Sequence, residues 1–178
     1  MDRNKIFSLE LTGFVFISIL GSLLHFTFDF LGGWPPVALF AAANESVWEH
    51  LKLVFWPSLI YAIIEWRVFR GDIKGFWTAK TLGILSMPAI IVLGFYGYTT
   101  IAGRNMLWAD ISLFIAAVFI GQMISVRLMR RRSFPPAIKI LTIALIASMI
   151  VAFSLMTFFP PHAPLFREPR TGQYGILR

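Results

Sequence analysis

The sequence predicts an all-α integral membrane protein, a single domain over residues 1–178 built as a bundle of about five transmembrane helices. Hydrophobic residues make up 57% of the chain, whereas a soluble domain holds about 45–50%. Charged residues make up only 14%, against about 25% in soluble proteins. A chain of 178 residues has too little interior to bury this much apolar surface, so lipid is the expected solvent for much of it.

Five apolar segments are each long enough to cross a bilayer. A helix rises about 1.5 Å per residue, so about 20 residues span the hydrocarbon core. A membrane barrel would need strands of about 9–11 residues with alternating polarity, and no segment alternates in this way. The expected helices are residues 7–28, 47–68, 81–102, 107–128 and 140–159.

The first segment is expected to be a retained helix. Its uncharged run, residues 11–28, is longer than the apolar region of a secretory signal peptide, about 7–15 residues, and no small-residue cleavage site follows it. The next stretch, residues 31–44, is apolar but contains several helix breakers, which predict an interfacial or re-entrant connection. The breakers are Gly32, Gly33, Pro35 and Pro36.

The second segment is unusual because its uncharged core, residues 53–64, is too short to cross alone. Crossing therefore requires that ionisable residues at one end or the other lie at the membrane boundary: Glu49, His50 and Lys52, or Glu65 and Arg67. Ionisable groups in such positions are costly and indicate function by default. Pro57 in this segment and Pro88 in the third predict packing kinks.

The last helix is expected to end before two prolines, with the tail, residues 160–178, turning back across the outer end.

Lys and Arg accumulate in cytoplasmic loops. Five helices divide the 16 basic residues eleven to five in favour of the side that holds the N-terminus. This asymmetry predicts the N-terminus inside and the C-terminus outside, with Arg130-Arg131-Arg132 as a cytoplasmic anchor. Because the basic residues lie in short loops, they serve topology, and no nucleic-acid partner is expected.

This topology gathers polar groups at the outer side. All three histidines, His25, His50 and His162, fall there. His25 and Asp29 are four residues apart and share a helix face. An imidazole and a carboxylate so placed can bind a divalent metal or form a base with its orienting partner. Ser22 lies three residues before His25, on a neighbouring position of that face.

Residues 44–52 form a second polar group. Glu45 and Glu49 share one face, as do Ser46 and His50. Ser46 followed by Glu49 is also a capping-box pattern, in which both side chains satisfy free backbone donors at a helix start. The cap accounts for Ser46 and Glu49 but leaves Glu45, His50 and Lys52 unexplained.

Two or three histidines with a carboxylate, and one position left open for water, are typical of a catalytic zinc site. We expect the metal ligands to be His25, Asp29 and His50, with His162 as an extra ligand. The candidate catalytic residues are Glu45 or Glu49 as general base, together with Ser22. The chain has no cysteine, and it lacks the H-E-x-x-H, G-x-S-x-G and phosphate-loop motifs, so other hydrolase and nucleotide-driven classes have no motif support.

Several runs carry a resemblance. They are Gly21-Ser22-Leu23-Leu24-His25-Phe26, Asn44-Glu45-Ser46-Val47-Trp48-Glu49-His50-Leu51-Lys52, Phe55-Trp56-Pro57 and Thr171-Gly172-Gln173-Tyr174-Gly175. In these the chain resembles a family of small bacterial multi-pass membrane proteins known only as a domain of unknown function. The resemblance implies the bacterial inner membrane and brings no activity. Ser22, His25 and Asp29 are also similar in kind to the zinc-site residues of alkaline-ceramidase and progestin-receptor-type proteins, which have seven helices and a late H-x-x-x-H that this chain lacks.

Three functions are open at this point. A metal-dependent hydrolase would use a divalent metal such as zinc on a lipid or peptide substrate at the outer leaflet. A proton- or cation-coupled transporter would use the same groups, with Glu10, Glu65, Gln122 and Asp110 extending the path. A non-catalytic partner or sensor would dock another protein at the outer cluster. The lipid bilayer is the expected partner in each case, and the oligomeric state is left open.

Overall fold

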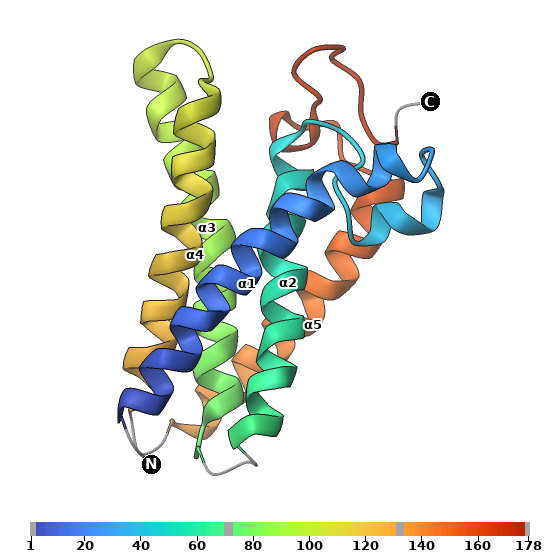
Figure 1. Cartoon of the computed structure of the whole chain (residues 1–178). Helices are drawn as coiled ribbons and strands as arrows, with labels where there is room; N and C mark the ends of the chain where they lie inside the picture. The colour runs from blue at the N-terminus through green and yellow to red at the C-terminus, as the bar shows by residue number, and fades with distance from the viewer. Residues whose placement is uncertain (1–2, 70–72, 131–133, 177–178) are drawn as a thin grey trace.

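The computed structural model describes residues 3–69, 73–130 and 134–176. In these ranges the chain forms two short 3-10 turns, no strand and five long helices (Figure 1). The helices are α1 (Arg3–Phe30), α2 (Val47–Phe69), α3 (Phe76–Ala102), α4 (Leu107–Met129) and α5 (Pro136–Phe158). The turns are η1 (Pro35–Leu39) and η2 (Pro164–Phe166). The prediction of an all-α fold is confirmed. Arg131 and Arg132 of the expected basic anchor lie outside the described residues.

All five helices are long and apolar enough to cross a membrane, so the chain is a multi-pass membrane protein. The second helix, α2, has the lowest mean hydropathy of the five and is also the most enclosed, with 61% of its apolar window buried against 17% for α5. This burial explains how α2 tolerates a short uncharged core. Glu49, Lys52 and Glu65 are buried and find partners inside the bundle, so lipid does not have to solvate them. Arg67 is exposed near the end of the helix.

The helices are arranged around α2. The hairpin of α3 and α4 stands on one side, α1 packs against both α2 and α4, and α5 lies beside α2 and α3 (Figure 1). The two chain termini lie at opposite ends of the bundle, and we name these ends after them. Aromatic rings of α2 and α5, among them Trp48, Phe55 and Phe153, form the core near the C-terminal end.

A close contact joins α1 to α2. Pro57 has no N–H, so the carbonyl of Leu53 four residues earlier loses its helical partner. Gly21 of α1 lies against this carbonyl, since a Cβ built on Gly21 would be 2.4 Å from the Leu53 oxygen. Only glycine permits this approach. The contact therefore fixes α1 against α2 one helical turn before His25.

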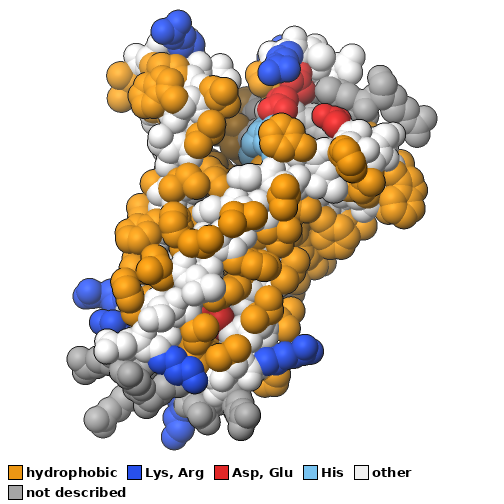
Figure 2. Space-filling view, viewed as in Figure 1, with side chains coloured by type: hydrophobic (Ala, Val, Ile, Leu, Met, Phe, Trp, Pro, Cys, Tyr) orange, Lys and Arg blue, Asp and Glu red, His pale blue; other side chains and the backbone are white. Residues whose placement is uncertain are grey.

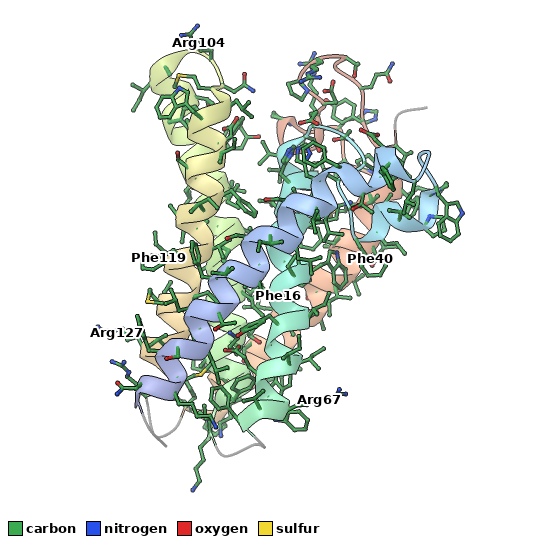
Figure 3. The ribbon with its side chains drawn as sticks, viewed as in Figure 1. Phe16, Phe40, Arg67, Arg104, Phe119 and Arg127 are labelled. Atoms are coloured by element: carbon green, nitrogen blue, oxygen red, sulfur yellow. The ribbon has the colours of Figure 1, made fainter. Side chains whose placement is uncertain are left out.

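The surface is hollowed at the C-terminal end. There the tips of α3 and α4 stand apart from α1, α2 and the tail, and Figure 2 shows histidine atoms on one wall of the gap. Figure 3 places Arg67 and Arg127 toward the N-terminal end and Arg104 at the other. Which end faces the cytoplasm stays a prediction from the distribution of basic residues.

Candidate metal centre

The turn that begins α2 is held by side-chain hydrogen bonds. Asn44 Oδ1 accepts from the Ser46 N–H at 2.8 Å, and Ser46 Oγ accepts from the Glu49 N–H at 3.4 Å. Glu49 does not return to Ser46, as a capping box would have it, but accepts from the Ala43 N–H at 2.7 Å. Asn44 has taken over the Ser46 donor, which frees Glu49 to reach one turn further back along the chain.

This arrangement divides residues 44–52 between two faces. Glu49 and Lys52 point into the bundle, where Lys52 Nζ lies 2.6 Å from Glu49 Oε2. The same ammonium donates to Ala38 O at 2.6 Å and Thr157 Oγ1 at 3.0 Å. Glu45 and His50 lie on the other side of the turn and reach the surface. The unusual charge density of this run therefore serves both a buried anchor and a partly open cluster.

His25, Glu45 and His50 meet at the C-terminal end. The Nε2 atoms of the two histidines are 3.1 Å apart, and Glu45 Oε2 lies 3.8 Å from His25 Nε2 and 3.5 Å from His50 Nε2. Among the described residues, these three form the group whose ligand atoms could hold a metal ion. The side chains are 29%, 43% and 32% exposed, so solvent reaches the cluster without surrounding it.

The spacing of the three atoms fits a tetrahedral metal. Zinc binds imidazole nitrogen and carboxylate oxygen at about 2.0–2.2 Å, so neighbouring ligand atoms of a tetrahedron lie about 3.3–3.5 Å apart. The observed separations of 3.1, 3.5 and 3.8 Å bracket this value. Two histidines and one carboxylate also match the ligand set of catalytic zinc sites, which keep a fourth position for water.

The orientation of His50 suits metal binding. Its Nδ1 lies 2.8 Å from the Ser46 carbonyl oxygen, which can only accept, so we assign the proton to Nδ1. Nε2 then presents a lone pair to the centre of the cluster. Holding a ligating histidine through its other nitrogen is the usual way in which proteins orient such a ring. His25 Nδ1 is buried and has no hydrogen-bond partner among the described residues.

The other residues predicted from the sequence lie elsewhere. Asp29, one turn beyond His25 on α1, is exposed, and its carboxylate forms no ion pair with a described residue. Ser22 donates to the Ser18 carbonyl at 2.8 Å. Glu49 is buried and forms an ion pair with Lys52. His162 stacks on Tyr174 in the tail, with ring centroids 4.7 Å apart, and is not one of the three clustered residues.

The tail nevertheless touches the loop that carries Glu45. Asn44 Nδ2 donates to the Gly175 carbonyl at 2.8 Å, which ties residues far apart in the chain. Phe166 of η2 packs on Trp48 of α2, with ring centroids 4.8 Å apart. The expected fold-back of the tail therefore has a counterpart in these contacts, and the tail supports the start of α2 from outside.

A second polar cluster lies near the N-terminal end, where Glu10 and Glu65, named from the sequence as parts of a transport path, meet a lysine that the sequence did not place there. Lys80 of α3 lies 2.9 Å from Glu10 Oε2 and 2.5 Å from Glu65 Oε2. All three side chains are at most 1% exposed. Lys80 falls just outside the predicted range of the third helix, residues 81–102, whereas α3 begins at Phe76. The signal that could have placed it is the need of two intramembrane glutamates for a cation.

The fold and this site define a multi-pass helical membrane protein with a His/Glu group near one end of its helix bundle. The chain belongs to a family of unknown function (DUF6512), whose family model matches residues 3–176. No curated protein and no solved structure matches the chain.

Proposed function

We propose that the protein is a metal-dependent hydrolase that binds a zinc-like divalent ion through His25, Glu45 and His50. One observation carries the proposal: three ligand atoms from two segments of the chain converge with the edge lengths of a tetrahedral site. Such an ion, when bound, would act as a Lewis acid and lower the pKa of a coordinated water to about 7. The chain supplies the ligands, the ring orientation and an opening to solvent.

Glu45 takes a different role from the one expected for it. The sequence suggested it as general base, but its Oε2 lies as near to both histidines as a third ligand should. Glu49, the other candidate base, is committed to Lys52 and to the Ala43 amide. We therefore assign no side-chain base, and the metal itself would generate the nucleophile. Asp29 was expected as a metal ligand; because it is exposed and is not one of the three grouped residues, we assign it instead to substrate binding at the edge of the cluster.

The position of the cluster favours a substrate that lies at the membrane surface. His25 is near the end of α1 and His50 near the beginning of α2, so both lie close to a membrane boundary. Phe26, the next residue on α1, lies against His25 with ring centroids 4.8 Å apart and is 68% exposed, so an apolar side chain borders the cluster. A lipid, or a peptide emerging from the bilayer, would meet the cluster at this level. With the orientation predicted from the basic residues, this is the outer leaflet.

The test is the metal content of detergent-purified protein, measured by plasma mass spectrometry after growth with zinc. We expect about one zinc per chain in the wild type and a loss of at least ten-fold in occupancy in His25→Ala and in His50→Ala. His162→Ala is the matched control, because this histidine lies outside the cluster, and it should keep its metal.

Wild-type protein without metal, or a His25→Ala variant with unchanged metal, would refute the metal site.

The reaction class has its own test. Purified protein is incubated with phospholipid vesicles and with membrane-derived peptides, with and without a chelator, and products are followed by mass spectrometry. Hydrolysis that stops with chelator and returns with zinc is the expected result. A zinc-loaded protein that releases no product from either would leave the metal site standing and overturn the hydrolase assignment.

A further inference from the structure

A buried triad near the N-terminal end of the bundle joins three helices. Glu10 comes from α1, Glu65 from α2 and Lys80 from α3. Lys80 Nζ donates to both oxygens of Glu10, at 3.0 and 2.9 Å, and lies 2.5 Å from Glu65 Oε2. The triad is therefore a compact group of three ionisable side chains, each almost fully removed from solvent.

The charges of the triad do not balance. Two ionised carboxylates and one ammonium leave a net charge of −1 inside a membrane bundle. Within the described residues, no cation other than Lys80 lies within ion-pair distance of either carboxylate. An uncompensated ion in a low-dielectric interior is so unfavourable that a group which can take up a proton does so.

The neighbours on each packed helix cannot supply the missing positive charge. Tyr61 of α2 donates its hydroxyl to Leu9 O at 2.6 Å, and Lys80 Nζ lies 5.7 Å from its ring centre. Gln122 of α4 donates to the backbone oxygen of Glu10 at 3.1 Å. Ser125 of α4 is buried and has no partner among the described residues. All three side chains are uncharged at neutral pH, so they polarise the cluster without neutralising it.

We infer that the Glu10–Glu65–Lys80 triad is a proton-binding site, which holds one proton between its two carboxyl groups. Glu65 is the better carrier of this proton. Both oxygens of Glu10 accept from Lys80, whereas neither oxygen of Glu65 has a hydrogen-bond partner of good geometry beyond its close ion pair. Glu65 Oε1 is thus the oxygen at which a proton displaces no existing bond.

The triad also lies close to one end of the bundle. Glu65 is four residues before the end of α2, and Lys80 four residues after the start of α3. Four residues of helix correspond to about 6 Å along the axis. The proton is therefore about one helical turn from the N-terminal surface, which is an arrangement suited to uptake and release from a single side of the membrane.

Infrared spectroscopy of the purified full-length protein in lipid tests the inference, because an un-ionised carboxylic acid has a carbonyl stretch that a carboxylate lacks. At neutral pH we expect the wild type to show this band, and we expect the band to shift after exchange into D2O. Glu65→Gln and Glu10→Gln should each remove it, since the one remaining carboxylate is balanced by Lys80. Glu168→Gln, at a carboxylate of the tail that accepts hydrogen bonds from Thr171 and lies outside the triad, is the matched control and should keep the band.

Lys80→Met provides an independent arm. Without the ammonium, both buried carboxyl groups must be neutral, so the band should grow about two-fold in a variant that still elutes as a folded species and keeps its helical circular dichroism. A wild-type protein without the band at neutral pH would overturn the inference, and so would a band that survives in both glutamine variants.

Discussion

Lys52 joins three separate parts of the chain through one ammonium group. Its bonds reach Ala38 in η1, Glu49 in the same helix and Thr157 near the end of α5. Neither charged side chain of the pair is more than 3% exposed. Because the partner of a buried charge cannot turn to water, the loss of Lys52 leaves Glu49 as an uncompensated anion.

We therefore expect Lys52→Met to lower the free energy of unfolding by about 3–5 kcal/mol. The double variant Glu49→Gln with Lys52→Met should lose less, because no charge then stays behind. Thermal unfolding in detergent, followed by circular dichroism, measures both. Lys139→Met, at an exposed position of α5, is the control and should change stability by no more than about 0.5 kcal/mol. A double variant less stable than Lys52→Met alone would contradict this account.

Glu49 and His50 are adjacent in the sequence, yet only His50 belongs to the metal-ligand group. The pair shows which part of the site can be predicted from the sequence and which part cannot. The run 44–52 indicated function because its charges exceed the needs of a helix cap, and the structure places Glu45 and His50 beside His25 as a ligand group. Glu49 was grouped with them by its type. The direction of the Glu49 side chain depends on where α5 and η1 pack around α2. The spacing of residues within one helix contains no information on the packing of other elements.

At the scale of elements, Gly21 sets the distance between α1 and α2. A methyl group at this position would overlap the Leu53 carbonyl, which is backbone and cannot move aside as a side chain could. Gly21→Ala should therefore separate the two helices near His25 and His50. We expect zinc affinity to fall by about 10–100-fold, the range typical when the support of a metal ligand is altered.

The affinity is measured by competition with a zinc-binding dye. Gly97→Ala provides the control, since this helical glycine of α3 has open space where the new Cβ would lie. It should bind zinc as the wild type does. Unchanged affinity in Gly21→Ala would show that the α1–α2 contact does not set the geometry of the cluster.

The elements also show why hydropathy found the helices and missed the triad. Apolar length predicts a transmembrane helix because lipid contacts most of its surface. Lys80 violates this rule, and α3 begins at Phe76, so it includes a lysine that the apolar pattern excluded. Its charge is tolerated only because Glu10 and Glu65 come from two other helices. A contact between three helices is a property of packing, and no window of one segment can report it.

For the whole molecule, the orientation predicted from Lys and Arg places the histidine cluster outside and the triad near the cytoplasm. The absence of cysteine makes this simple to test. Single cysteines at Asn105, between α3 and α4, and at Lys74, before α3, lie at opposite ends of the bundle. On intact cells, a membrane-impermeant maleimide should label Asn105→Cys and spare Lys74→Cys. The opposite pattern would invert the topology and put the metal centre in the cytoplasm.

The hydrogen bond from Asn44 to Gly175 has a practical meaning for anyone who handles the protein. Asn44 is next to Glu45 in the chain, so a displacement of the tail at Gly175 is transmitted to Glu45, a proposed metal ligand. A polyhistidine tag fused after the tail would add competing imidazoles to a segment that is hydrogen-bonded to the loop of Glu45. The opposite terminus, on the far side of the bundle, is the better place for an affinity handle.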